Sequence, residues 1–378
     1  MSIHERYGLT RVINAKGTFT PFGVSRSSPH VGSTVAQALG EFFIIDELQS
    51  LVSRSAAELS GAEAAAVTHC VAAATTISVA AAMAGSHPEK IAALPDTRTM
   101  PDRVVLPAGH AVDYGHPNTI DIRLAGATPV IAGSPSMCSI QDLEAAMADE
   151  RTACLLLVSS RLTSGPPIDL HEAVAAAHRR GVPAIIDGAA QDMRMDRLVA
   201  TGADAVLVSA QKYLASPTAG LILGRAGFVS DCRAQERGIG RAMKATKEAI
   251  LGVMASLEDR RRLDLEDWRE TQARKVAYLA ERLNRIDGIS AAEVPDPAGM
   301  PLSRVRLTVQ RHGDSWNAMV LAERLRSGTP PIWLMEHAAR DGHLFLELVP
   351  LDKAELQVIA ERVAQCARGT SFRAEPEE

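Results

Sequence analysis

Two stretches of sequence decide the fold: PAIIDGAA at residues 183–190 and DAVLVSAQK at residues 204–212. In each, a short and nearly continuous apolar run leads to a charged residue, Asp187 in the first stretch and Lys212 in the second. Continuous apolar runs predict strands that are covered on both faces, as the strands of parallel sheets are. The helical pattern QDMRMDRLVATG lies between them, which favours two neighbouring parallel strands joined by a helix.

Five further apolar runs of the same kind lie around this pair. The helical segments between them carry start signals, because Ser139 and Asp169 stand where N-caps are expected. The connection around Ser216 and Pro217 is too short for a parallel crossover, so we expect the last two strands to pair antiparallel. The sequence thus predicts an α/β domain with a large, seven-stranded, mostly parallel sheet. The five further strands are AAAVTHC (64–70), RVVLPAG (103–109), TPVIAG (128–133), ACLLLVSS (153–160) and AGLILG (219–224).

The pattern changes in the last third of the chain. Residues 241–286 are helical in character, and a shorter helix is expected near residues 314–327. The segments SRVRLTV (303–309) and HLFLELV (343–349) resemble strands, and a final helix is expected from Asp352. These elements predict a small C-terminal α+β domain.

Composition narrows the class of protein. The chain has 378 residues, 46% of them apolar, and a formal charge of −5, which suits a packed protein and gives no basic surface for nucleic acid or an anionic membrane. The five cysteines are scattered without a C-x-x-C pair, and the N-terminus has no apolar signal segment. We therefore expect a reduced, cytoplasmic protein that binds neither nucleic acid nor a membrane. The histidines have no metal-ligand spacing, so no metal site is expected.

The strand ends carry the chemistry. Carboxyl ends of neighbouring parallel strands form the ligand crevice of an open sheet, so Asp187 and Lys212 can meet one ligand from two sides. Pyridoxal 5′-phosphate (PLP) needs such a pair, a lysine for the imine and a carboxylate that keeps the pyridine nitrogen protonated. Ser209 can reach the cofactor phosphate, and the small-residue helix after Cys70 offers free N–H groups to it. From the two residues alone, a structural ion pair remains the alternative.

Nucleotide binding has less support in this sheet. No G-x-G-x-x-G follows the first strand, and no G-x-x-x-x-G-K-[ST] occurs in the chain. Two other residues carry a weaker signal. From the residues alone His110 is interpreted as a surface histidine, and Arg26 either binds an acidic substrate group or faces solvent.

At this point the chain resembles fold-type-I PLP enzymes of the selenocysteine synthase-like group, which also contains D-glucosaminate-6-phosphate ammonia-lyase. The resemblance covers nearly the whole chain, and its most specific stretch is G-R-x-M-K-x-x-K-E within residues 240–258. The other matching segments are RVINAKGTFTPFGVSRSSPHV (11–31), DELQ (46–49), ELSGAEAAAVTHCVAA (58–73), PAGHAVDYG (107–115), IIDGAAQ (185–191), SAQKYLASPTAGLILG (209–224) and PPIW (330–333).

The resemblance implies a role for each matched residue. Lys212 is implied to be the Schiff-base lysine and proton shuttle, Asp187 to contact the pyridine nitrogen, and His110 to stack on the ring. The remaining implied roles are cofactor binding by Ser209, Gln191, Cys70, Val71, Ala72 and Thr218, the last toward the partner subunit's phosphate, and substrate binding by Arg26, Arg241 and Lys244.

The resemblance also implies an architecture. We expect the fold-type-I PLP-dependent transferase fold, with a large PLP-binding α/β domain over residues 51–255 and a small α+β domain over residues 256–368. Residues 1–50 are expected to pack at the active site and at the interface of a homodimer or higher even homo-oligomer. Residues 369–378 are expected to be disordered.

The function implied is a PLP-dependent lyase. It would catalyse α,β-elimination with ammonia release from a small hydroxy- or sugar-derived amino acid, through a lysine aldimine and a quinonoid. Aminotransferase, racemase and aldolase chemistry start from the same bound state and remain alternatives. A PLP-binding protein without turnover is the non-enzyme alternative, against which the intact Lys212, Asp187 and Ser209 argue.

Overall fold

A computed structural model describes residues 1–368, and the predicted disordered tail at residues 369–378 lies outside this part. The chain forms two compact units, one of Ser27–Arg262 and one of Met1–Arg26 together with the chain from Leu263 on. The sequence-based boundaries fell instead at residues 50/51 and 255/256. The difference arises because the first 26 residues pack with the C-terminal elements, a non-local pairing that composition does not reveal.

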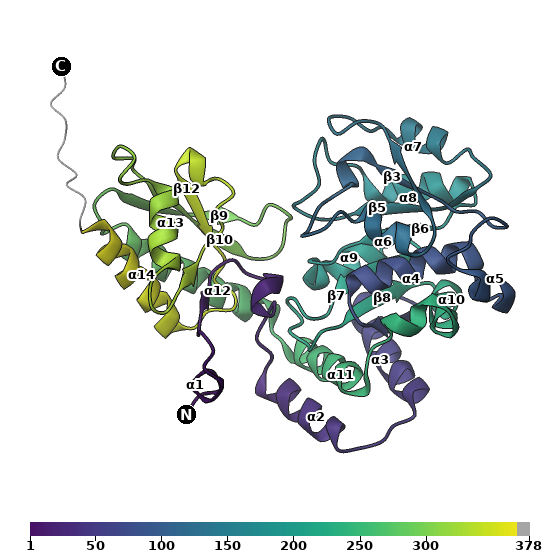
Figure 1. Cartoon of the computed structure of the whole chain (residues 1–378), viewed down its shortest axis with the longest axis horizontal. Coiled ribbons are helices and arrows are strands. Elements are labelled where there is room, and N and C mark those ends of the chain that lie inside the picture. Colours follow the sequence, from purple (N-terminus) through teal and green to yellow (C-terminus); the bar gives the residue numbers. More distant parts are fainter. Residues whose placement is uncertain (369–378) are drawn as a thin grey trace. The chain divides into compact units, whose positions relative to one another are not determined.

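The Ser27–Arg262 unit is built on a seven-stranded sheet in the order β2-β8-β7-β6-β5-β3-β4 (Figure 1). Strand β8 runs antiparallel to both neighbours, and the pairs among β7, β6, β5, β3 and β4 are parallel. The predicted seven strands and the antiparallel last pair are thus confirmed. The strands are β2 (Ala64–Thr68), β3 (Arg103–Pro107), β4 (Thr128–Ala132), β5 (Thr152–Val158), β6 (Ala184–Asp187), β7 (Ala205–Ser209) and β8 (Gly220–Gly224).

Apolar cores cover both faces of this sheet. Successive residues of β5 alternate between them, because Leu155 and Leu157 join one core while Cys154 and Leu156 join the other. This explains why the strands are apolar throughout rather than alternating. One core includes residues of α3 (Ile45–Ser60), α7 (Ile140–Ala146), α8 (Leu170–Arg179), α9 (Met195–Val199) and α11 (Lys247–Arg262); the other includes α4 (Val71–Ala84), α5 (Pro88–Ala93), α6 (Thr119–Leu124) and α10 (Ala226–Ala234).

Local capping explains where two of these helices begin. The hydroxyl of Ser139 accepts the N–H of Asp142 at the start of α7, and the Asp142 carboxylate accepts the Ser139 N–H in return. The Asp169 carboxylate accepts the N–H groups of His171 and Glu172 at the start of α8. Both caps were predicted, because short polar side chains satisfy N–H groups that the first helical turn leaves free.

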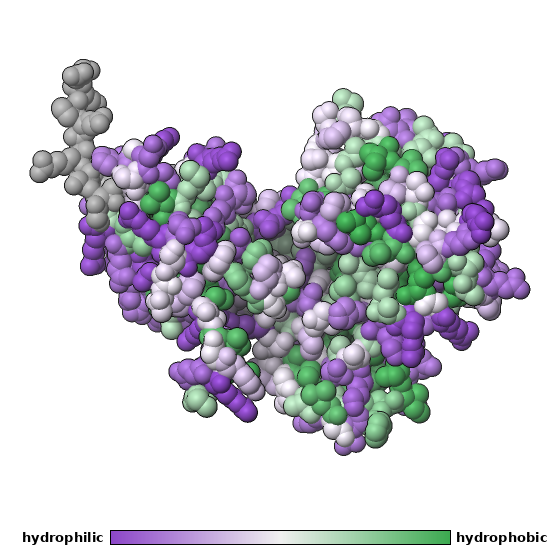
Figure 2. All heavy atoms as spheres, in the orientation of Figure 1, coloured by the Kyte–Doolittle hydropathy of each residue, from purple (hydrophilic) through white to green (hydrophobic). Residues whose placement is uncertain are grey.

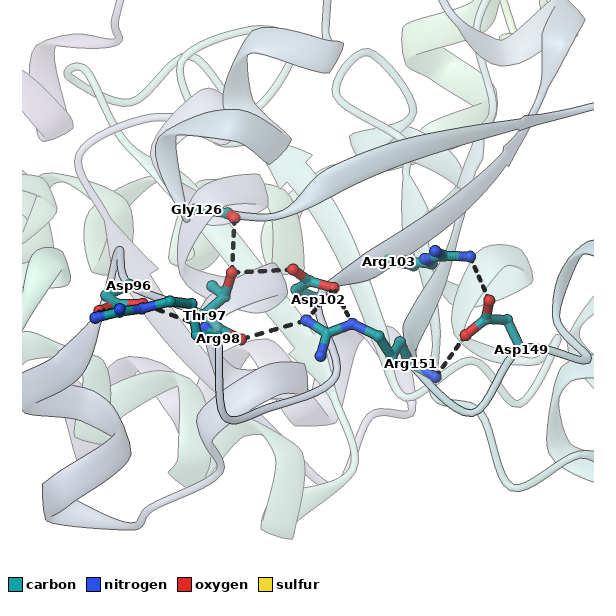
Figure 3. A network of polar contacts seen from close by, with 8 residues as sticks. All are labelled: Asp96, Thr97, Arg98, Asp102, Arg103, Gly126, Asp149 and Arg151. Carbon is teal, nitrogen blue, oxygen red and sulfur yellow. Dashed lines mark hydrogen bonds and ion pairs between the residues drawn. The ribbon is translucent and has the colours of Figure 1, made fainter.

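A polar network fixes the edge of the sheet where β3 and β5 begin (Figure 3). The Thr97 hydroxyl donates to the Asp102 carboxylate and to the carbonyl of Gly126, at 3.0 and 3.2 Å. Arg151 pairs with the same carboxylate at 2.8 Å. Ligand crevices form at the opposite ends of the strands, the carboxyl ends. We therefore assign this network a structural role and not a role in ligand binding.

The other unit contains a three-stranded antiparallel sheet in the order β12-β10-β9. Strand β1 (Ile13–Asn14) pairs parallel with β11 (Ile332–Trp333), which brings the N-terminal segment into this unit's core. Its other elements are α1 (Ile3–Tyr7), α12 (Leu265–Leu283), β9 (Ile289–Pro295), β10 (Ser303–Val309), α13 (Ala318–Arg326), β12 (His343–Leu346) and α14 (Lys353–Ala367). Helix α2 (Pro29–Leu39) is part of the Ser27–Arg262 unit.

Two details of the C-terminal third differ from the sequence-based expectation. The helix expected over residues 241–286 is interrupted, since α11 ends at Arg262 and the Asp264 carboxylate caps α12. Strand β9 was not predicted. It lies at the edge of its sheet and is mostly exposed, so its sequence lacks the apolar signal of a buried strand. Within residues 1–368, no helix is long and apolar enough to cross a membrane.

Candidate active site

The carboxyl ends of four strands meet at one edge of the large sheet. Gly220 of β8 lies between Thr68 at the end of β2 and Ser209 at the end of β7. On the other side of β7, strand β6 ends at Asp187, which is paired with Val158 at the end of β5. Asp187 and Ser209 therefore lie at adjacent strand ends, the place where open α/β sheets bind ligands, and Lys212 follows Ser209 by three residues.

Asp187 is a buried carboxylate at the end of β6, with 8% of its surface exposed. Its Oδ1 accepts the N–H of Ala189 at 2.9 Å. Burial raises the pKa of the Asp187 carboxyl, and the Ala189 N–H and the charge of Lys212 act in the opposite direction. The structure thus brings Asp187 and Lys212 within electrostatic reach of each other, and the buried carboxylate favours a cation beside it.

Lys212 lies in a tight turn between β7 and β8. Its N–H donates to the carbonyl of Ser209 at 3.2 Å, and its own carbonyl accepts the N–H of Ala215 at 3.1 Å. The N–H of Ala210 bonds to the carbonyl of Ala219, which closes the base of the turn. The lysine is therefore held on a short, hydrogen-bonded loop rather than on a long one.

The β2–α4 connection lies at the same edge of the sheet. Cys70 is the N-cap of α4, and its side chain makes no capping hydrogen bond. The first N–H groups of a helix have no partner inside the helix, so those at Val71 and Ala72 are suited to an anion. An added Cβ on Gly220 would lie 2.6 Å from the Cys70 carbonyl, so the β7–β8 turn and the β2–α4 loop approach as closely as glycine permits.

His110 follows β3 and is 6% exposed. Its Nδ1 accepts the N–H of Val158 at 2.9 Å, which fixes the ring and leaves the proton of the neutral imidazole on Nε2. Burial lowers the pKa of His110 to about 4. The side chain is therefore a neutral, oriented ring and not a surface histidine.

Gln191 and Asp192, after β6, are both buried. Neither amide atom of Gln191 has a hydrogen-bond partner, although the residue is only 1% exposed. The Asp192 carboxylate lies 3.5 Å from the Arg260 guanidinium, and burial raises its pKa to about 6. Arg260 also donates to the carbonyls of Asp192 and Tyr213, so it ties the loops after β6 and β7 together. Sequence reasoning missed the Asp192–Arg260 pair, because Arg260 comes from the distant α11.

The segment containing Arg241 and Lys244 runs beside the β2–α4 loop. The N–H of His69 donates to the carbonyl of Met243 at 2.8 Å, and Lys244 forms a β-bridge with Thr68. Both Arg241 and Lys244 are exposed. Thr218, on the loop before β8, is exposed as well.

Arg26 belongs to the other unit. Its guanidinium makes two hydrogen bonds to the buried carboxylate of Glu355, at 2.6 and 2.9 Å, and one to the carbonyl of Pro350. The Arg26 side chain is thus paired with Glu355 and is still 53% exposed, in keeping with its interpretation as a solvent-facing charge. Its predicted contact with substrate stays a prediction.

The residues at this edge fit PLP. The buried Gln191 amide has hydrogen-bonding atoms still to satisfy, and the buried Asp187 carboxylate favours a cation beside it. The N-terminus of α4 suits a phosphate, and the missing side chain at Gly220 lets the β7–β8 turn lie against the β2–α4 loop. Lys212 supplies the amine. Asp187 and Gln191 would hold the ring, while α4 would hold the phosphate.

Comparison with known proteins extends this result. No family model matches the chain. It is 33% identical over 368 residues to D-glucosaminate-6-phosphate ammonia lyase of Salmonella typhimurium, covering 97% of this chain and 98% of that protein. It is 34% identical over 346 residues to a 5′-C-glycyluridine monooxygenase-decarboxylase of a Streptomyces species, covering 90% of this chain and 86% of that protein.

A solved structure agrees with this relationship. The structure of a D-glucosaminate-6-phosphate ammonia-lyase has a TM-score of 0.87 and 32% identity, over 98% of this chain and 99% of that one. The predicted fold class is confirmed by this similarity. The chain belongs to the D-glucosaminate-6-phosphate ammonia-lyase family of fold-type-I PLP-dependent enzymes.

Proposed function

We propose that this enzyme is a PLP-dependent lyase that eliminates a β-hydroxyl group and releases ammonia from a small hydroxy- or sugar-derived amino acid. The observation that carries the proposal is that Asp187 and Lys212 lie within electrostatic reach of each other at one edge of the large sheet, in a chain related over 97% of its length to an ammonia lyase. A sugar-derived amino acid is the natural first candidate, since that relative is named for one.

Each residue of the site has a task that its surroundings support. Bound PLP would supply an electron sink for the carbanion formed at the amino acid's α-carbon. Lys212 would hold the cofactor covalently and, once released, remove the α-proton. Asp187 would keep a proton on the pyridine nitrogen, and that cation would in turn relieve the cost of its own burial.

The neutral state of His110 suits a place against the cofactor ring. A charged imidazolium there would oppose a protonated pyridine nitrogen, and the pKa of His110, lowered by burial to about 4, avoids this. Phosphate binding would fall to the N–H groups at Cys70, Val71 and Ala72 and to the Ser209 hydroxyl. Gln191 would lie near the 3′-oxygen, Thr218 would approach the partner subunit's phosphate, and Arg26, Arg241 and Lys244 would bind substrate.

We further propose a homodimer. Support comes from an apolar patch between α2 and α3, on the N-terminal segment expected at the interface, with Phe42 fully exposed. Figure 2 shows hydrophobic atoms along the part of the surface where α2, α3 and α11 lie. Exposed apolar patches of this kind mark interaction sites. The patch comprises Leu39, Phe42, Phe43, Ile44, Ile45 and Leu51.

Sedimentation tests this assembly. The wild type should sediment as a dimer or a larger even oligomer, and Phe42→Asp with Ile44→Asp should shift it toward the monomer. A monomeric wild type would refute the proposal. We also propose a cytoplasmic location. The five cysteines support it, because all of them are free thiols, as is usual in a reducing compartment.

A substrate screen tests the proposed activity. The purified holoenzyme is given D-glucosaminate 6-phosphate and both enantiomers of serine and threonine, while ammonia, 2-oxo acid and oxygen are followed. Lyase activity predicts equal amounts of ammonia and 2-oxo acid without oxygen uptake. Transamination would give 2-oxo acid without ammonia, and oxygen uptake would indicate chemistry like that named for the Streptomyces relative. Lys212→Ala is the control that should abolish every product.

A further inference from the structure

A cluster of three ionisable side chains lies next to the proposed site and has no role in it so far. The Tyr114 hydroxyl donates to Oδ2 of Asp121, and His116 Nε2 lies 2.7 Å from the same hydroxyl and 3.2 Å from Oδ1 of Asp121. The tyrosine and histidine rings meet edge to face, with centroids 4.8 Å apart. The two rings come from one loop, and Asp121 comes from α6.

This cluster is attached to the elements that build the proposed site. Asn118 donates its side-chain amide to the carbonyl of His110 at 2.9 Å, so the loop is fixed to the residue proposed to face the cofactor ring. The hydroxyl of Thr76, on the phosphate-binding helix α4, donates to the carbonyl of Asp121 at 2.9 Å. The cluster therefore has a fixed position relative to both.

Electrostatics also link the cluster to the site. Asp121 is 1% exposed, and burial raises its pKa against the opposing effects of Tyr114 and His116. Burial and Asp121 raise the pKa of Tyr114, and the charges of Asp187 and Cys70 add to the increase. The charge of Asp121 likewise raises the pKa of Asp187. These groups are thus close enough for their charges to interact.

The atoms of the cluster differ in whether they can bind a further group. The Tyr114 proton is committed to Asp121, and Asp121 is buried. His116 uses Nε2 against these two partners, which leaves Nδ1 for another group, and its side chain is 36% exposed. This is the arrangement of a histidine oriented by a buried carboxylate, as general acids and bases commonly are.

We propose that His116 is the general acid that protonates the leaving hydroxyl, with Asp121 and Tyr114 as positioning residues. The role rests on the proposed elimination and deepens it. Lys212 takes the α-proton, the electrons of that C–H bond form the Cα=Cβ double bond, and the Cβ–O bond breaks. His116 enters this step with both ring nitrogens protonated. The oxygen leaves with its bonding electrons and the Nδ1 proton as water, which leaves the imidazole neutral, and solvent returns the proton to Nδ1.

Two amino acids that differ in leaving group test this role. Chloride leaves without a proton, whereas hydroxide requires one. For His116→Gln we expect kcat with D-glucosaminate 6-phosphate to fall by about 100-fold, the usual scale for one general acid. Ammonia release from D- or L-β-chloroalanine and α-proton exchange in deuterated water should stay within about twofold of the wild type.

The positioning residues and the controls sharpen the test. Asp121→Asn should lower kcat for the hydroxyl substrate with little change in KM, and adding it to His116→Gln should cause little further loss, because both act on one proton transfer. His171→Gln, at an exposed histidine of α8, is the matched control. PLP content per chain and the absorbance spectrum of the holoenzyme should be unchanged in all variants.

The outcomes separate this role from the proposed function. Equal losses with hydroxyl and chloride leaving groups, or a parallel loss of α-proton exchange, would overturn the role of His116 while leaving the elimination intact. Unchanged turnover of the hydroxyl substrate in His116→Gln would do the same. A wild type that neither exchanges the α-proton nor releases ammonia would overturn the proposed function itself, and this role with it. Should His116→Gln lose PLP, His116→Asn and Asp121→Asn carry the same comparison.

Discussion

Replacement of Asp187 by asparagine tests the electronic core of the site. Asparagine has nearly the same shape and retains an oxygen that can accept the Ala189 N–H, so the end of β6 should keep its structure. The change removes the charge that would hold a proton on the pyridine nitrogen. Cofactor binding should change little, because the lysine bond and the phosphate contacts are left in place.

The magnitude follows from the burial of Asp187. Breaking a buried charge pair costs about 3–5 kcal/mol, and the lower end applies here because Ala189 already shares part of the charge. A barrier raised by about 3 kcal/mol slows a reaction roughly 100-fold. We therefore expect α-proton exchange to fall about 100-fold in Asp187→Asn.

The assay is α-proton exchange in deuterated water, followed by NMR, with PLP content measured on the same samples. Asp196→Asn, at an exposed position of α9, is the matched control and should exchange at the wild-type rate. Wild-type exchange in Asp187→Asn would refute the electronic argument even with Lys212 correctly assigned. Loss of PLP in parallel with exchange would mean instead that Asp187 serves mainly to bind the cofactor.

Three further changes probe the lysine, the histidine and the close approach of the two loops. Borohydride should link PLP to Lys212 alone, as seen by peptide mapping, and an adduct on Lys244 or Lys16 would overturn that assignment. His110 has its pKa lowered from 6.5 to about 4, so its neutral form stabilises the fold above pH 6.5 and this contribution is lost as the pH falls toward 4. The unfolding free energy of the wild type relative to His110→Gln should therefore fall by about 3 kcal/mol between pH 7 and pH 4 in denaturant titrations, and a constant difference would contradict the burial argument. Gly220→Ala should destabilise the protein by about 1–3 kcal/mol in denaturant titrations and weaken PLP binding, because its Cβ meets the Cys70 backbone. Gly227→Ala, which has open space around its Cβ, is the control and should change neither stability nor PLP binding.

The sequence by itself determined the large sheet and the placement of the first residues of the proposed site. The seven strands are recognisable because each is buried on both faces, so its signal is a local, continuous apolar run. The helix starts at Ser139, Asp169 and Asp352 are recognisable because caps are local contacts within one turn. The pair of Asp187 and Lys212 follows from the same logic, since residues at successive parallel strand ends share one edge.

Only the tertiary structure decided what depends on contacts between distant segments. Strand β9 exists because it pairs with β10, and its own exposed sequence gives no sign of it. Arg26 is bound by Glu355 from the far end of the chain, and Arg260 reaches Asp192 from α11. Such pairings have no periodicity and no fixed spacing, so their energy appears only once the chain has folded.

The Tyr114–His116–Asp121 cluster shows the same division within one short segment. Its residues lie close together in sequence, yet their polar types alone are equally compatible with an exposed loop. Folding buries Asp121 beneath α4, and burial makes its carboxylate depend on the Tyr114 and His116 side chains. The sequence thus supplied the chemical groups, and the packing of α4 against α6 turned them into an oriented unit beside the proposed site.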